Sequence, residues 1–253
     1  MRRIIIGISG ASGVAYGVRL LQVLATVDEV ETHLVMTQAA RRTLALETDL
    51  SVEEVEGFAK VVHKYSDISA CISSGSFRTA GMIVAPCSIK TAAGIAACFS
   101  DNLLLRAADV ILKERRQLIL LVRETPMHLG HLRLLVQLAD MGAIIMPPTP
   151  AFYHRPSTVE DIIDQTVNRA LDMLDVELHH DLFARWQGPT ARPGAARKIR
   201  DAAQGALANA DIPLGRKASQ KKENGIAKLT AAGRFVLPPS LSGRDPSSQK
   251  RFE

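Results

Sequence analysis

The segment best suited to binding an anion is Ser88 to Thr91, which follows a short apolar run from Gly81 to Ala85. The run predicts a buried strand, and the Ala-rich stretch after Thr91 predicts a helix. A helix that begins among small hydroxyl residues offers an anion its backbone N–H groups, side-chain hydroxyls and the positive end of its dipole. Because Lys90 adds a positive charge, we expect this segment to hold a phosphate group.

A cation and an acid, Arg123 and Glu124, follow the apolar run 117–122, which predicts another buried strand. At a strand end, before the loop at Pro126, such a pair can hold a phosphate and exchange a proton with it. The two side chains are therefore candidates for a phosphate-binding cation and a general acid.

Two other spacings are compatible with ligand binding. Arg106 and Lys113 are two turns apart on the predicted helix 102–116 and share one face, which is either solvated or part of a second phosphate site. His128 and His131 are three residues apart and could share a metal, but no third ligand is evident nearby. We expect no metal site.

A glycine-rich turn, Gly7 to Gly13, follows the first apolar run. Its spacing is G-x-x-G-x-x-G rather than the G-x-G-x-x-G of dinucleotide-binding folds. Thr37 follows the predicted strand 32–36, where a dinucleotide fold usually has an acid for the ribose. The hydroxyls of Ser12 and Thr37 favour a flavin or another phosphate ligand over NAD, although the glycines alone are also compatible with a plain tight turn.

The elements that position these residues alternate between strand and helix patterns, which predicts a parallel sheet with helices on both faces. Ligands of such sheets bind at the carboxyl ends of the strands. We therefore expect the loops at Gly10, Thr37, Ser88, Arg123 and Tyr153 to meet at one edge. Capping signals are predicted at Ser51 with Glu54, at Asp101, and at Ser157 with Glu160.

Charge divides the chain into two parts. Residues 189–253 contain 13 Lys or Arg against 5 Asp or Glu, a net charge of +8, whereas residues 1–188 contain 18 against 21, a net charge of −3. Half of the 12 prolines also lie after residue 188. We predict a folded domain over 1–188 and a basic, mostly disordered extension over 189–253, with a possible helix at 195–210. The body has no general signal for nucleic acid.

Neither a membrane span nor a secretory leader is predicted. No apolar run approaches the roughly 20 residues that a bilayer crossing needs, and the basic N-terminus lacks an adequate apolar core. The three cysteines show no metal-like pairing, which favours reduced thiols in a cytoplasmic protein. His63 and Cys71 are interpreted as structural residues.

Six motifs, spread in order from residue 1 to about Gly188, resemble those of the UbiX-type flavin prenyltransferases. They are GISGASGVAYGVRLLQVL, ETHLVMTQAARRTLALETD, ISSGSFRTAGMIVAPCSIKT, RAADVILKERR, RETPMHLGHLRLL and MPPTPAFYHRP. The resemblance implies a three-layer α/β sandwich with a flavodoxin-like or Rossmann-like parallel sheet. It also implies a homododecamer whose active sites are shared between subunits.

The resemblance further implies transfer of a dimethylallyl group from dimethylallyl phosphate to N5 and C6 of reduced FMN, without a metal, in ubiquinone synthesis. The product, prenylated FMN, would go to a UbiD-type decarboxylase. The positions that match family flavin contacts are Gly10, Ala11, Ser12, Thr37, Ser88, Ile89, Lys90, Thr91 and Arg123. Those that match the prenyl-phosphate site are Tyr153, Arg169, Arg106 and Lys113. Those that match catalytic positions are Glu124, Ser12, Glu47 and Lys113.

Three other functions remain open from the residues themselves. The same loops would suit a flavin-dependent decarboxylase or its accessory subunit, although no separate carboxylate site is visible. A flavin carrier would need no acid beside a second phosphate, so Glu124 speaks against it. A nucleic-acid-binding protein would depend on the basic extension and would bind in a salt-sensitive manner.

Overall fold

The structure is a computed structural model that describes residues 1–188 of the 253-residue chain. The predicted basic extension and its helix at 195–210 lie outside the described residues. The elements, in chain order, are β1 (Arg2–Ile8), α1 (Val14–Leu24), β2 (Val30–Met36), α2 (Gln38–Glu47), α3 (Val52–Gly57), β3 (Val61–His63), the 3₁₀-helix η1 (Cys71–Ser73), β4 (Gly81–Cys87), α4 (Ile89–Ala96), α5 (Leu103–Lys113), β5 (Gln117–Val122), α6 (Leu129–Asp140), β6 (Ile144–Ile145) and α7 (Val159–Asp172).

The six strands form one parallel sheet in the order β3-β2-β1-β4-β5-β6. Its central strands are apolar because both of their faces are covered, and every residue of β4 is buried. The flavodoxin-like, doubly wound sheet is confirmed, and its strand order is the one typical of dinucleotide-binding folds.

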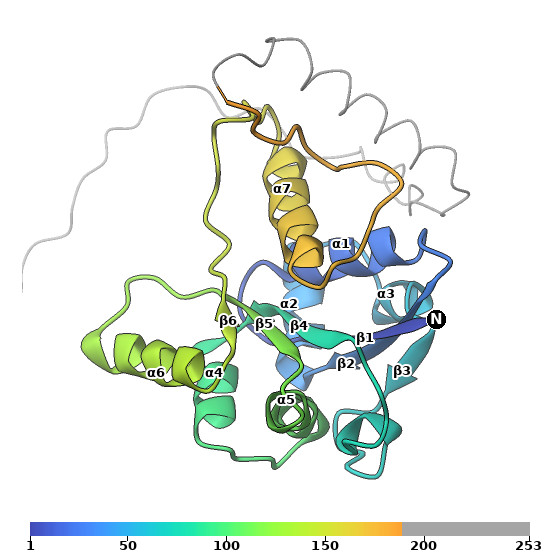
Figure 1. Cartoon of the computed structure of the whole chain (residues 1–253), viewed down its shortest axis with the longest axis vertical. Coiled ribbons are helices and arrows are strands. Elements are labelled where there is room, and N and C mark those ends of the chain that lie inside the picture. The colour runs from blue at the N-terminus through green and yellow to red at the C-terminus, as the bar shows by residue number, and fades with distance from the viewer. Residues whose placement is uncertain (189–253) are drawn as a thin grey trace, which may run out of the picture. The chain divides into compact units, whose positions relative to one another are not determined.

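Helices cover both faces of the sheet and complete the expected three layers (Figure 1). Ile4 and Ile6 of β1 face a core formed with α1, α2, α3 and α7. Ile5 faces the opposite core, formed with η1, α4, α5 and α6. Alternate residues of one strand thus enter different cores, as the two-residue period of a strand requires.

The chain reverses its direction of winding between β1 and β4. From β1 it continues through α1 to β2 on one side, and from β4 through α4 and α5 to β5 on the other. A crevice opens at the carboxyl ends of the two strands at such a point, and ligands of doubly wound folds bind there. The loops that follow β1 and β4 therefore border the expected site.

Hydroxyl and amide side chains begin the helices that leave this edge. Thr37 caps α2, Ser88 caps α4 and Asn102 caps α5. The prediction of Asp101 as the α5 cap was wrong by one residue, because the Asp101 carboxylate instead accepts a bond from the Asn102 amide. The helix also ends earlier than expected, at Lys113.

The capping box of α7 also lies one residue later than predicted. Thr158 is the cap and Asp161 is its reciprocal partner, rather than Ser157 and Glu160. The Asp161 carboxylate accepts bonds from both the Ser157 and the Thr158 backbone N–H groups, at 2.7 and 3.1 Å. The box predicted at the start of α3 is confirmed.

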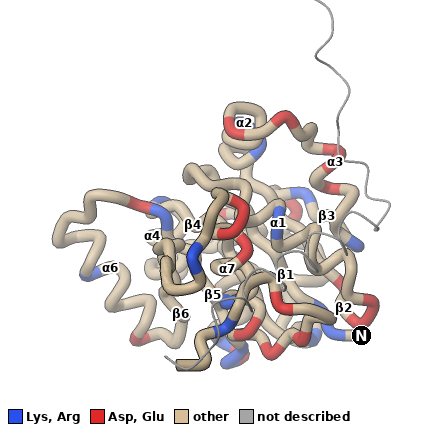
Figure 2. Tube along the Cα trace, turned by 90° about the horizontal axis from the view of Figure 1, so that it is seen from above, with Lys and Arg blue, Asp and Glu red and all other residues tan. Residues whose placement is uncertain are grey.

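Acidic and basic residues are interspersed over the described part of the chain (Figure 2). This distribution agrees with the small net charge of residues 1–188. No helix within that range combines the length and the hydropathy of a membrane span.

Candidate active site

A buried serine that the sequence analysis did not single out joins the loops that follow β1 and β4. Ser9 is fully buried at the end of β1 and donates its hydroxyl to the Pro86 carbonyl at 2.8 Å. The same oxygen accepts the Ser88 N–H at 2.8 Å. Ser9 therefore fixes the start of α4 relative to β1. Its one sequence signal was a hydroxyl placed directly after an apolar strand.

The N-terminus of α4 has the features predicted for a phosphate site. The Ser88 hydroxyl accepts the Thr91 N–H at 3.2 Å and donates to the Thr91 hydroxyl at 3.1 Å. The other N–H groups of the first turn, at Ile89 and Lys90, have no partner within the helix. They lie at the positive end of the helix dipole, and the Lys90 side chain is exposed beside them.

The N-terminus of α1 is already occupied by an acid of the same chain. Glu47, at the end of α2, accepts the N–H groups of Gly13 and Val14 at 2.8 and 3.0 Å. Partial burial raises the pKa of Glu47, but the Ser12 hydroxyl, these two N–H groups and the Arg123 charge outweigh it, so the pKa is lowered overall. A carboxylate at this helix start leaves α4 as the better place for a phosphate.

The second predicted flavin loop is held against the first by close packing. Thr37 donates its backbone N–H to the Ile8 carbonyl at 3.0 Å, and its hydroxyl accepts the Ala40 N–H at 3.0 Å. At Gly10 an added Cβ would lie 2.3 Å from the Cβ of Ala39, so only glycine fits there. The segment Gly10–Ser12 thus lies directly against the start of α2.

Arg123 and Glu124 extend the same edge beyond β5. The Arg123 N–H donates to the Cys87 carbonyl at 3.0 Å, which places the pair beside the α4 start. The Glu124 carboxylate accepts the Thr125 N–H at 3.0 Å. The structure therefore brings together the predicted flavin residues and two of the acids, Glu47 and Glu124, at one edge of the sheet.

Two of the predicted substrate-binding cations, Arg106 and Lys113, are both engaged with other groups of the same chain. Arg106 donates to the Ser73 carbonyl at 3.2 Å and pairs with Asp109 at 2.7 Å. Lys113 pairs with Glu114 at 2.5 Å, in the last turn of α5. Because α5 returns the chain to the start of β5, Lys113 lies at the amino edge of the sheet, opposite the flavin loops.

Arg169 also lies away from the crevice. It is in the last turn of α7 and pairs with Asp172 at 2.8 Å. Just beyond this turn, the Leu174 carbonyl accepts a bond from Arg2, at the start of β1, at 2.6 Å. The end of α7 is therefore directed toward the amino edge of the sheet.

Tyr153 was expected beside the other loops, but the chain leaves the sheet after β6 and runs to the start of α7 (Figure 1). Among the residues described, the ring of Tyr153 packs edge-on against His154 and Trp186, with centroids 5.6 and 6.0 Å apart. It remains 47% exposed. Within one chain, the residues predicted to bind flavin thus lie at one edge of the sheet, whereas Tyr153, Lys113 and Arg169, predicted to bind the prenyl phosphate, lie away from it.

Known proteins of similar sequence share the whole described domain. A family model described as Flavoprotein matches residues 1–171. The flavin prenyltransferase UbiX of Salmonella typhimurium is 66% identical over 188 residues, which are 74% of this chain and 100% of the relative. The flavin prenyltransferase UbiX of Escherichia coli K12 is 65% identical over the same shares.

Solved structures agree with these relatives. AnUbiX (PadA1), in complex with FMN and dimethylallyl pyrophosphate, has a TM-score of 0.72 and 48% identity, covering 74% of this chain and 98% of its own. A dodecameric protein of Escherichia coli O157:H7, described as an FMN-dependent UbiX-like decarboxylase, has a TM-score of 0.70 and 49% identity, covering 74% and 99%. The chain belongs to the flavoprotein family and, within it, to the UbiX flavin prenyltransferases.

Proposed function

We propose that this chain joins the dimethylallyl group of dimethylallyl phosphate to N5 and C6 of reduced FMN and releases phosphate. The observation that carries the proposal is the Ser9-centred edge, where a helix start suited to phosphate lies beside the Arg123–Glu124 pair. The reduced flavin supplies two nucleophilic ring positions, N5 and C6. The protein must hold the flavin, accept the leaving phosphate and move protons.

The flavin half of the site has a defined role for each segment. Backbone N–H groups at Ile89 and Lys90, with the Ser88 and Thr91 hydroxyls, hold the flavin phosphate. Gly10, Ala11 and Thr37 border the ring, and Arg123 adds a cation. Ser12 lies beside N5. The other edge residues thus orient the ring without entering the chemistry.

The two acids divide the proton transfers between them. Glu124 donates to the leaving phosphate as the allylic C–O bond breaks, because the phosphate gains negative charge at that moment. Glu47 accepts a proton during ring closure. The lowered pKa of Glu47, which the Ser12 hydroxyl and two backbone N–H groups cause against the effect of burial, keeps it ionised for that role.

The prenyl-phosphate half, Tyr153, Arg169, Arg106 and Lys113, is completed by neighbouring subunits. The exposed faces of the chain support such an assembly. Leu129, Leu132 and Val136 form an exposed apolar stripe on α6, with exposures of 60%, 49% and 61%. The relative from Escherichia coli O157:H7 is dodecameric. Preorganised cations from adjoining subunits stabilise the leaving phosphate without requiring a metal.

The product is then delivered to a UbiD-type decarboxylase. We place the whole activity in residues 1–188, since two flavin prenyltransferases match this chain over 188 residues that make up their entire length. A structure with dimethylallyl pyrophosphate exists for AnUbiX, so both the phosphate and the diphosphate are candidate donors.

The test is anaerobic incubation of the full chain with reduced FMN and each donor, followed by mass spectrometry of the released flavin. We expect a gain of one C5 unit. Glu124→Gln should slow its formation by about 10²–10⁴-fold, the usual worth of a general acid. The exposed Glu53→Gln variant is the matched control and should keep the wild-type rate.

Two other results would replace the proposal. FMN that binds but stays unmodified with both donors would make the chain a carrier. Release of CO₂ from an aromatic acid by the FMN-loaded chain alone would make it a decarboxylase, the activity in the description of one similar structure.

A further inference from the structure

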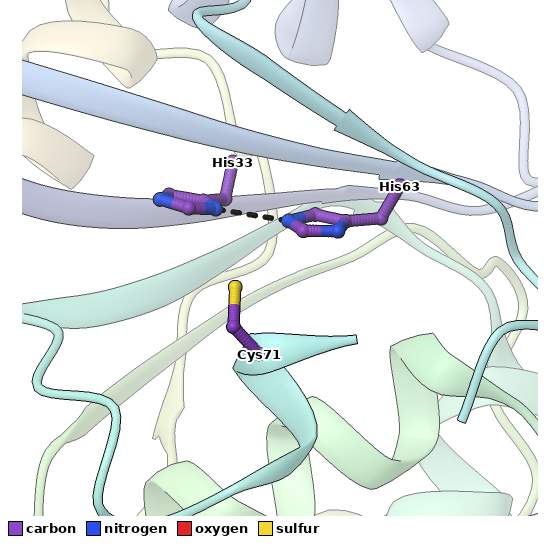
Figure 3. Close-up of side chains that lie close together, drawn as sticks. All are labelled: His33, His63 and Cys71. Atoms are coloured by element: carbon purple, nitrogen blue, oxygen red, sulfur yellow. Dashed lines mark hydrogen bonds between the residues drawn. The ribbon is translucent and has the colours of Figure 1, made fainter. Parts of the chain in front are cut away.

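Two histidines and a cysteine from three separate segments meet on the α5 side of the sheet. His33 of β2 and His63 of β3 are buried, with 2% and 9% exposure, and their rings lie edge to edge and nearly parallel, with centroids 5.2 Å apart and an interplanar angle of 11°. His33 Nδ1 and His63 Nε2 are 2.9 Å apart. The Sγ atom of Cys71, on η1, points at this pair, and the three atoms all lie within 4.8 Å of one another (Figure 3).

A carboxylate determines which ring nitrogen of His33 faces His63. Glu31, two residues earlier on the same face of β2, lies 2.9 Å from His33 Nε2 and 3.1 Å from the Arg3 guanidinium. With the Nε2 proton held by Glu31, the lone pair of Nδ1 points at His63. A carboxylate behind a histidine is the usual support of a metal-ligating imidazole.

The ligand atoms are close to the spacing that a tetrahedral ion needs. Bonds of about 2.0–2.1 Å to nitrogen and 2.3 Å to sulfur place such ligand atoms roughly 3.3–3.6 Å apart. As the ion replaces the proton between them, the nitrogens would move apart by a few tenths of an ångström and the two rings would tilt so that both lone pairs point at the ion. The sulfur would move inward. Cys71 can follow because it is exposed on a short helix, whereas the histidines belong to the sheet.

We propose that His33, His63 and Cys71 bind a divalent ion of the zinc class, with Glu31 positioning His33 and the fourth coordination place open. Two imidazoles and a thiolate favour zinc or cobalt over magnesium or calcium, which prefer oxygen. The ion would tie the edge strand β3 and η1 to the centre of the sheet. This inference is independent of the proposed prenyl transfer, and the site takes no part in it.

The first experiment needs no variant, because the chain carries its own control. Cys71 and Cys98 are both exposed free thiols, and only Cys71 lies in the cluster. The metal-stripped full chain is alkylated with iodoacetamide with and without Zn²⁺, and each cysteine is followed by peptide mass spectrometry. We expect Zn²⁺ to slow alkylation of Cys71 at least tenfold and to leave Cys98 unchanged. Equal rates at Cys71 with and without the ion would overturn the proposal.

The second experiment identifies the ligands with Co²⁺, which shows a thiolate-to-cobalt charge-transfer band when sulfur is bound. One Co²⁺ per chain should give this band in the wild type and in Cys98→Ser, and excess Zn²⁺ should remove it. The band should be absent in Cys71→Ser. A band that persists in Cys71→Ser, or one that is lost equally in Cys98→Ser, would contradict the assignment.

The role of Glu31 is tested by the affinity for Co²⁺. Glu31→Gln should weaken binding by about 10–100-fold while keeping the band, as expected for loss of a supporting carboxylate. The neighbouring exposed Glu29→Gln is the matched control and should bind as the wild type does. Unchanged affinity in Glu31→Gln would show that the carboxylate does not position His33.

Discussion

The Ser9 hydroxyl makes two bonds in a place that water does not reach, so its removal has a predictable cost. Ser9→Ala leaves the Ser88 N–H and the Pro86 carbonyl without these partners. We expect a loss of about 1–3 kcal/mol in the free energy of unfolding and weaker FMN binding, because the α4 start is no longer fixed. Urea unfolding and flavin fluorescence titration measure the two effects. The exposed Ser66→Ala should change stability by no more than about 0.5 kcal/mol.

The Glu47 carboxylate makes the link between α2 and α1 sensitive to acid. Its folded-state pKa lies below the ordinary value of 4.5, since the bonds from Ser12, Gly13 and Val14 outweigh burial. Such a group stabilises the fold above that value and loses its effect as the pH falls through the folded pKa. The stability difference between wild type and Glu47→Gln should therefore be full at pH 7 and shrink below pH 4.5. A difference that stays constant across this range, measured by urea unfolding, would contradict the assignment.

Single residues were predictable where the local sequence pattern indicated their chemistry. Ser88, Lys90 and Glu124 lie within three residues of a strand end, and they were predicted as site residues for that reason. Ser9 was missed because a single hydroxyl carries no pattern of its own. His33 and Cys71 were missed as a pair because 38 residues of chain separate them, and only the strand register and η1 bring them together.

The α2 helix and the loop after β1 pack so closely that one added methyl group should destabilise the fold. Gly10→Ala places a Cβ 2.3 Å from the Cβ of Ala39, so we expect a loss of about 1–3 kcal/mol, as for other overpacked sites. The double variant with Ala39→Gly should recover much of that loss, giving a coupling energy in a double-mutant cycle. Gly57→Ala, where nothing lies within 4 Å, is the control and should be neutral or stabilising.

Helices and strands were predictable as elements because their periods are local, but their caps depend on a choice between adjacent polar residues. At α5, either Asp101 or Asn102 could have capped the helix. Asn102 is the cap because its extended backbone lets its side-chain oxygen accept the Leu105 N–H at 3.0 Å. At α7, Asp161 rather than Glu160 closes the box, since its short carboxylate reaches back to the Thr158 N–H.

The proposed sharing of sites between subunits concerns the whole molecule and is tested by mixing inactive variants. Glu124→Gln and Lys113→Met should each be nearly inactive alone. Hybrid oligomers, co-expressed with two tags and purified by both, should regain part of the wild-type rate, because some sites combine a wild-type Glu124 with a neighbour's Lys113. Hybrids of Glu124→Gln with itself are the control and should stay inactive. Hybrids of the two variants that also stay inactive would place both residues in one chain's site.

The family resemblance implies shared sites, but the residue patterns themselves could not show which residues one chain brings together. Tyr153, Arg106, Lys113 and Arg169 carry chemistry suited to phosphate, and their types were recognised. Which edge of the sheet each reaches depends on the directions of α5 and α7 and on the path after β6. These paths place Tyr153, Lys113 and Arg169, which were predicted to bind the prenyl phosphate, away from the predicted flavin loops of the same chain.

The pairing of Arg106, Lys113 and Arg169 with acids of their own chain has a consequence for how activity depends on dilution. If the sites are shared as proposed, a lone subunit, in which these cations are paired with its own acids, should not ionise the donor. Turnover per subunit should then fall as the protein is diluted below its assembly concentration. The reactive allylic cation of the proposed reaction would then form only in assembled oligomers, and unassembled chains would not release it to water.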